Sequence, residues 1–171
     1  GINIGNYEKK KVLPEGYYSI CITAYDYDNS TPIQVSNNIC AQAWMMLSDP
    51  PFLNLPSCKS TLTPITPQNV VFQWTAMNLS SPNSFASTEY EFALWEIRPE
   101  GTDPNVIVQS IPPVFQTTVS STTLVYGLGE PPLNLGTNYA WRVRAVDVSG
   151  RDYFKNRGTV SYTHLRAHET V

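Results

Sequence analysis

Both histidines of this chain, His164 and His168, lie near its end at the spacing of a metal site. On a helix, H-x3-H places two imidazoles on one face, where they could bind zinc. Glu169 is the only nearby side chain that could act as a third ligand. Because this set is smaller than the usual zinc site, we predict no metal site and no bound cofactor.

Acidic residues form a second group of candidates. Glu89 and Glu91 share one face of an expected strand, but a glycosidase pair must flank a cleft. The stretch "DYDNS", from Asp26 to Ser30, resembles a calcium loop but lacks the glycine and the distal glutamate of an EF-hand. We interpret these groups as surface glutamates and a polar hairpin loop.

Motifs of nucleophilic catalysis are missing from the sequence. It contains no G-x-S-x-G, no P-loop, no G-x-G-x-x-G and no C-x-x-C. Apart from the two C-terminal histidines, no imidazole is present to activate a serine or a cysteine. We therefore predict that the chain is not an enzyme and has no catalytic residues.

Composition favours strands over helices. The 171 residues include 14 prolines and 10 tyrosines, and only 15% are charged. Proline breaks helices, and few charged side chains are available for their solvent faces. The net charge of -3 gives no electrostatic reason to expect nucleic acid. No apolar run reaches the roughly 18 residues of a membrane span, so we expect no membrane insertion.

Strand-like runs recur between clusters of Pro, Gly, Asn and Ser, which is typical of an all-β sandwich or barrel. The clearest runs are Tyr17–Tyr25, Ile39–Leu47, Val70–Thr75, Tyr90–Ile97, Val106–Ser110, Thr122–Tyr126 and Tyr139–Val146. Within "GTNYAWRVRAVD", period-two alternation directs Arg142 and Arg144 to solvent and the other phase to a core. The same reasoning predicts these core residues: Phe72, Trp74, Tyr90, Phe92, Leu94, Tyr139, Trp141 and Val143.

An internal repeat predicts the domain organisation. Leu13–Asp26 resembles Leu133–Asp147, with Tyr18 matching Tyr139, so one strand type occurs twice. We therefore expect the C-terminal hairpin of a truncated domain over 1–48, a linker over 49–56, a domain over 52–159 that lacks its native last strand, and an artefactual tail over 160–171.

The tail is set apart because Val160–Thr170 resembles the translation of a transposase sequencing adapter. We expect the biological sequence to stop near Thr159 and assign no function to later residues. Val160, Tyr162 and Thr163 nevertheless have strand propensity.

Three motifs occur in the order of a fibronectin type III domain. They are the tyrosine-corner form Leu133-x-x-Gly136-x-x-Tyr139, the strand "YAWRVRAVD" and the tryptophan of "VFQWT". Residues Pro51–Asp152 thus resemble nearly all of one such immunoglobulin-like β-sandwich, preceded by the last two strands of another copy. "PQNVVFQWT" and "TEYEFALWEIRPEG" also resemble repeats of large Bacteroidota surface proteins, the TANFOR-like group.

This resemblance implies a non-catalytic structural or interaction module of a multi-domain protein that is extracellular or on the cell surface. Its partners would be neighbouring domains of the same chain, which it spaces or presents in a tandem array. The alternative is an accessory module that binds polysaccharide or a surface protein. Such a module could be attached to an enzyme domain that lies outside this sequence.

The cysteines allow one disulfide. If Cys21 lies opposite Cys40 in an antiparallel pair, Ile22 opposes Ile39 and both faces of the hairpin are self-consistent. Opposed residues lie within disulfide reach, so we predict a Cys21–Cys40 bridge; two thiols at neighbouring positions are the alternative. Cys58 is expected to be unpaired here or bonded outside the chain.

Aromatic residues on outer strand phases are the candidate binding surface. Trp95 lies on the outer phase of one strand, and Trp44 with Tyr17 on that of another. Such rings can bind sugars, or they can be covered by a neighbouring domain or by the stems of Arg142 and Arg144.

Overall fold

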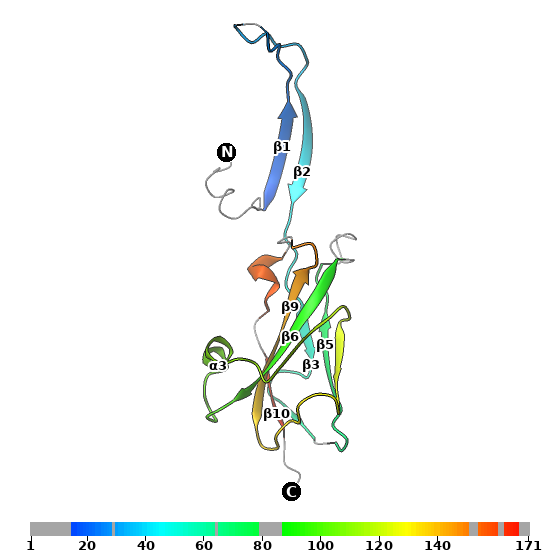
Figure 1. Ribbon diagram of the computed structural model, residues 1–171, viewed down its shortest axis with the longest axis vertical. Helices are drawn as coiled ribbons and strands as arrows, with labels where there is room; N and C mark the ends of the chain where they lie inside the picture. Colours follow the sequence, from blue (N-terminus) through cyan, green and yellow to red (C-terminus); the bar gives the residue numbers. More distant parts are fainter. Residues whose placement is uncertain are drawn as a thin grey trace. The chain divides into compact units, whose positions relative to one another are not determined.

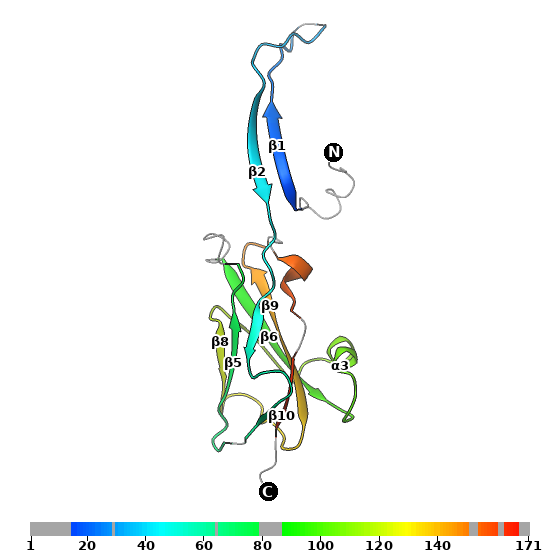
Figure 2. The same cartoon turned by 180° about the vertical axis from the view of Figure 1, so that it is seen from behind.

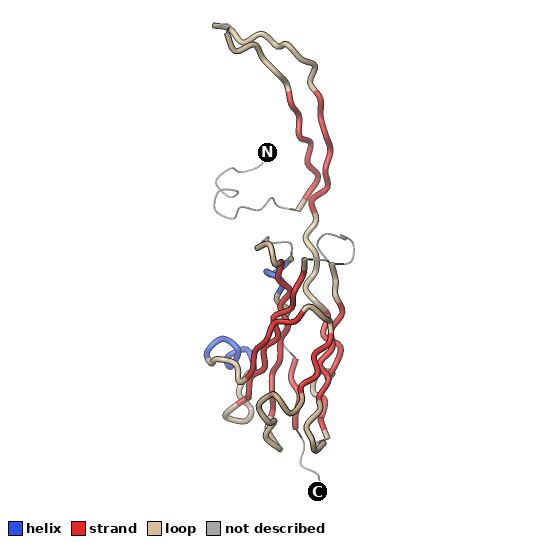
Figure 3. The backbone as a smooth tube through the Cα atoms, turned by 45° about the vertical axis from the view of Figure 1, so that its right-hand side comes forward, coloured by secondary structure: helices blue, strands red, loops and turns tan. Residues whose placement is uncertain are grey.

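The chain divides into two compact units, Gly1–Leu47 and Ser48–Val171. The computed structural model describes residues 15–28, 30–63, 65–78, 87–150, 154–160 and 163–167. Almost all of their regular structure is β, which confirms the predicted fold class (Figure 1; strands are red in Figure 3).

The first unit contains a two-stranded antiparallel hairpin, β1 (Gly16–Ile22) and β2 (Ile39–Met45). Cys21 lies opposite Cys40, and the predicted register is confirmed throughout the hairpin. A disulfide joins these two cysteines, which confirms the predicted bridge. The register follows from residue type, because a slip of one residue would exchange the two faces of each strand.

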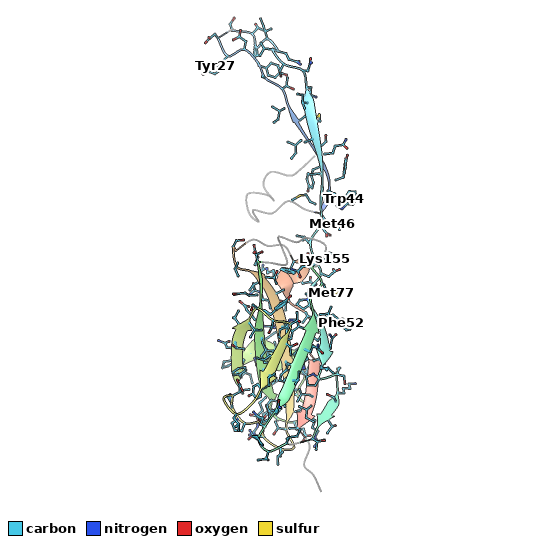
Figure 4. All side chains as sticks on the ribbon, turned by 90° about the vertical axis from the view of Figure 1, so that its right-hand side faces the viewer. Tyr27, Trp44, Met46, Phe52, Met77 and Lys155 are labelled. Carbon is cyan, nitrogen blue, oxygen red and sulfur yellow. A yellow bond between two sulfur atoms is a disulfide. The ribbon has the colours of Figure 1, made fainter. Side chains whose placement is uncertain are left out.

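The two faces of the hairpin are both exposed. Ile20 and Ile22 have the phase of core residues but are 58% and 72% exposed. Among the described residues of this unit, the single hairpin layer has no second layer to bury its apolar face. On the other face, the ring centroids of Tyr17 and Trp44 lie 6.1 Å apart, and Figure 4 shows Trp44 projecting from the hairpin.

The second unit contains a three-stranded antiparallel sheet of order β3–β5–β8. Its strands are β3 (Phe52–Leu55), β5 (Val70–Thr75) and β8 (Thr123–Tyr126). β3 lies in the segment 49–56 that we predicted to be a linker, and this is a correction. Phe52 is exposed (Figure 4) and Leu53 packs against the core, and antiparallel pairing with β5 makes this short segment a strand.

A five-stranded sheet of order β4–β10–β9–β6–β7 forms the other layer (Figure 1; Figure 2 gives the opposite view). Its strands are β4 (Ser60–Leu62), β6 (Thr88–Ile97), β7 (Phe115–Val119), β9 (Asn138–Asp147) and β10 (Thr163–Ala167). β10 lies in the tail that we set apart, and it fills the place where we expected a missing last strand. It pairs with β9 and β4, and it buries Leu165 and Ala167 in the core.

Aromatic rings fill the space between the two sheets. The ring centroid of Phe72 lies 4.8 Å from that of Phe92 and 5.1 Å from that of Trp141, and both contacts are edge-to-face. Such pairs add about 0.5–1.5 kcal/mol to the stabilisation from burial alone. All eight residues that we predicted for the core belong to this cluster, and none is more than 2% exposed: Phe72, Trp74, Tyr90, Phe92, Leu94, Tyr139, Trp141 and Val143.

Two tyrosine hydroxyls fasten the connection from β8 to β9. The hydroxyl of Tyr139 accepts a hydrogen bond from the backbone N–H of Asn134 at 2.8 Å, as the tyrosine-corner motif predicts. The hydroxyl of Tyr126 donates to the carbonyl of Pro131 at 2.6 Å. Two local hydrogen bonds, each between residues five apart in sequence, therefore hold the connection just before β9.

The run Val106–Ser110 was predicted to be a strand and is helical, α3 (Pro104–Ser110). The Asp103 carboxylate accepts from the N–H of Asn105 at 2.9 Å, and Pro104 occupies the first turn. An N-cap aspartate followed by proline is a strong helix start, and here it overrides the strand propensity of the β-branched residues.

Candidate functional site

The outer face of the five-stranded sheet carries a group of charged, polar and aromatic side chains that contact one another. Alternation on β6 turns Glu91, Ala93 and Trp95 to this face. The register places Arg144 beside Glu91 and Arg142 beside Ala93. These five side chains therefore meet on adjacent strands, although β6 and β9 are far apart in sequence.

A hollow of about 530 Å³ lies over this part of the sheet. Ala93 is the reason for the depression, because its methyl group stands between the longer side chains of Gln116 on β7 and Arg142 on β9. Trp95 and Pro113 line the hollow as well. Its volume is within the range of small-molecule sites, about 300–1,000 Å³.

Trp95 is on the outer face, as alternation predicts, but its predicted exposure was wrong. The side chain is only 4% exposed and packs with Ile107 of α3, which lies against this end of the sheet (Figure 1). Its indole N–H donates to the carbonyl of Ile111 at 3.0 Å. The guanidinium carbon of Arg142 lies 5.1 Å from the ring centroid, so the covered alternative is what the structure shows.

Two nitrogens of the Arg144 guanidinium make hydrogen bonds. Its Nη1 donates to Oε2 of Glu91 at 3.2 Å, and its Nε donates to the carbonyl of Arg157 at 3.1 Å. The ion pair is well exposed, so water screens it and its contribution to stability is small. It pairs the Glu91 carboxylate with Arg144 rather than with Arg142.

Arg142 differs from Arg144 in having no hydrogen bond or ion pair with any residue that the structure describes. Partial burial lowers the pKa of Arg142, the positive charge of Arg144 lowers it further, and Glu91 opposes the shift. The guanidinium stays charged at neutral pH. It is thus a fixed cation with hydrogen-bond donors available at the wall of a hollow.

The other predicted residues lie elsewhere. Tyr17 and Trp44 are on the hairpin and are exposed, as predicted. Cys58 is exposed and lies outside the disulfide. Of the three residues weighed as zinc ligands, His168 and Glu169 lie outside the described residues, as does position 29 of the acidic stretch 26–30. Among the described residues, no group of His, Cys, Asp and Glu could hold a metal ion.

Sequence reasoning missed the hollow itself. Gln116 lines it from β7, a strand that we did not predict, and Arg142 was predicted to face solvent or to cover an aromatic ring, not to line a hollow. The one sequence signal for the hollow was the short side chain of Ala93 between Glu91 and Trp95, which have the same phase. The hollow also requires side chains of the two neighbouring strands, and the sequence did not identify those strands.

Comparison with known proteins matches the chain to no family model and to no curated protein. Among the described residues, no helix has the length and apolar character needed to cross a membrane. The fold defines an all-β protein, with two facing sheets in the second unit and a disulfide-bridged hairpin in the first.

Proposed function

We propose that the chain is a non-catalytic, fibronectin type III-like module of a large multi-domain bacterial protein that is secreted or on the cell surface. It spaces or presents other parts of that protein in a tandem array. The observation that carries this proposal is the hairpin of the first unit, which repeats the core-facing pattern of β9 but has no covering sheet among the described residues.

The comparison of the two strands supports the proposal. Ile20 of β1 matches Trp141 of β9 in the internal repeat. Trp141 is fully buried under the three-stranded sheet, whereas Ile20 is 58% exposed. A strand with a core-facing pattern but no core is expected for the closing hairpin of a preceding sandwich, whose other strands would cover it.

Two further features agree with this assignment. The hydrogen bond from Asn134 to the Tyr139 hydroxyl has the geometry of the tyrosine corner found in immunoglobulin-like sandwiches. The Cys21–Cys40 disulfide is the kind of bond that persists in oxidising compartments, which supports an extracellular or cell-surface location.

Sequencing the parent gene on both sides of this coding segment tests the proposal. We expect further copies of the β9-type strand at intervals of about 100 residues, the size of one such sandwich. Fractionation of the source organism should place the protein outside the cytoplasm. A reading frame without further copies, or a cytoplasmic protein, would contradict the proposal.

The alternative function, binding of polysaccharide or a surface protein, is favoured by one observation: the exposed pair of Tyr17 and Trp44. Adjacent exposed rings offer a stacking surface to sugars or partners. Glycan-array binding that is lost in Trp44→Ala but kept in Tyr27→Ala would favour it, since Tyr27 is 98% exposed on the same unit. If the wild type, Trp44→Ala and Tyr27→Ala all fail to bind glycans, this alternative function is contradicted.

A further inference from the structure

We infer that the hollow on the outer face of the five-stranded sheet binds an acidic saccharide, with the Arg142 guanidinium pairing with the sugar carboxylate. This inference does not depend on the spacer function, because a module can space its neighbours with or without a ligand. It also uses a different surface from the Tyr17–Trp44 pair.

The first argument is that Arg142 is held in place before any ligand arrives. Its guanidinium stacks on Trp95, and Trp95 is fixed by its hydrogen bond to Ile111 and by α3. A guanidinium that is already ordered loses less conformational entropy on binding than a mobile one does. Its planar fork also matches the two oxygens of a carboxylate.

The second argument is the charge of the hollow. Two guanidinium groups and one carboxylate line it, from Arg142, Arg144 and Glu91. Glu91 pairs with Arg144, so the positive charge of Arg142 is left without a counterion among the described residues. The wall of the hollow therefore favours an anion, and a carboxylate is the anion with the matching shape.

The third argument concerns the rest of the lining. Gln116 and Thr118 share the outer face of β7, are neutral and carry an amide and a hydroxyl group, which can exchange hydrogen bonds with sugar hydroxyls. Ala93 supplies a small apolar floor against which a sugar ring can lie. An acidic peptide would instead pair with the backbone at the edge of β7, which is the last strand of this sheet among the described residues.

The contact between Arg142 and Trp95 could also have a purely structural role, for which we expect a different result. If Arg142 only covers Trp95, replacing it changes stability and has no effect on any ligand. The experiment therefore measures binding and stability separately on the full chain.

The probes are trigalacturonate, the neutral sugar galactotriose and the peptide triglutamate, titrated by calorimetry and by ¹H–¹⁵N NMR of the Trp95 indole N–H. We expect trigalacturonate to bind, to shift the Trp95 signal and to bind more weakly as salt is raised. Galactotriose should bind at least about tenfold more weakly, because a hydrogen-bonded charge is lost.

Arg142→Gln should weaken trigalacturonate binding at least about tenfold, since it removes the charge and keeps a similar length. The matched control is Arg98→Gln, which removes another arginine of the second unit that pairs with Glu96 outside the hollow; it should bind as the wild type does. Should Arg142→Gln fail to fold, Ala93→Leu serves instead, because it fills the floor and leaves both arginines in place.

Four results would overturn the inference: no binding of trigalacturonate by the wild type, equal binding by Arg142→Gln, retained binding by Ala93→Leu, or binding of triglutamate as tight as that of trigalacturonate. The last result would assign the carboxylate to a protein partner. None of these results bears on the tandem-array proposal, which gene sequencing decides.

Discussion

The hydroxyl group of Tyr139 offers a sharp test of how the β8–β9 connection is held. Tyr139→Phe removes one oxygen and keeps the ring, which is only 2% exposed and packs in the core. The N–H of Asn134, 2.8 Å from that oxygen, loses its acceptor. A hydrogen bond contributes about 0.5–1.5 kcal/mol, and a buried donor left unpaired costs about 1–3 kcal/mol.

Because Asn134 is exposed, water can replace part of the lost contact. We therefore expect the free energy of unfolding to fall by about 1–2 kcal/mol. The measurement is urea unfolding of the full chain, followed by tryptophan fluorescence, with an unchanged slope showing that the unfolded state is unaffected.

The matched control is Tyr90→Phe. Tyr90 is as buried as Tyr139, and no described residue hydrogen-bonds to its hydroxyl, so its loss should cost under about 0.5 kcal/mol. Tyr126→Phe should be intermediate, because the Pro131 carbonyl that it abandons still accepts from Nε2 of Gln68 at 3.4 Å. If Tyr139→Phe and Tyr90→Phe cost the same, the hydroxyl does not anchor the connection and the reasoning is refuted.

The remaining predictions concern the backbone, alkaline pH and the disulfide. A Cβ at Gly158 would collide with the backbone carbonyl of Ala145, and the φ angle of Gly158 is +75°, so Gly158→Ala should destabilise the second unit by about 3 kcal/mol or more in urea unfolding. Gly150→Ala is the control, because Gly150 also has a positive φ angle but lies in open space, and it should cost about 1 kcal/mol. Equal costs for the two variants would contradict the clash. Burial, Tyr139 and Glu130 together raise the pKa of Tyr126 to about 12 from 10.0, so the folded chain keeps this proton after the unfolded chain has lost it. Stability should therefore fall as pH rises from about 10 to about 12, by on the order of 2–3 kcal/mol, and a pH series of urea titrations should show a shallower fall in Tyr126→Phe. Reduction of the disulfide should speed amide hydrogen exchange in β1 and β2, since a bridge across 19 residues contributes about 3 kcal/mol and an isolated hairpin is marginal; unchanged exchange would show that the bridge does not hold the hairpin.

Alternation along single strands was enough to identify the core. Tyr139, Trp141 and Val143 share a face of any extended strand, whatever its neighbours are, because successive side chains point to opposite sides. The hairpin register could be predicted for the same reason, since the correct pairing of Cys21 with Cys40 also matched both faces. These conclusions required only the alternation of side chains along a strand and no knowledge of the tertiary structure.

Exposure could not be predicted in this way. Trp95 has the phase of a solvent-facing residue, yet α3 and Arg142 cover it. Ile20 has the phase of a core residue, yet it is exposed. Periodicity assigns a side chain to a face, but whether another layer covers that face depends on distant parts of the chain.

Local propensity also failed where capping competed with it. The β-branched residues of Val106–Ser110 favour a strand, but Asp103 and Pro104 begin a helix whose Ile107 packs on the sheet. β3 was missed because it is only four residues long and includes an asparagine, so its pairing with β5 decides its structure. β7, in contrast, has strand-forming residues in FQTTV, and its composition was a signal that we overlooked.

The sequence alone determined which residues share a face, which cysteines pair and which motifs of catalysis are absent, because these depend on residue type and spacing along one strand. Only the tertiary structure decided the strand order, the cover over Trp95 and the hollow above Ala93. The physical reason is that sheets join segments far apart in the chain, and the pattern within each segment does not specify its neighbour.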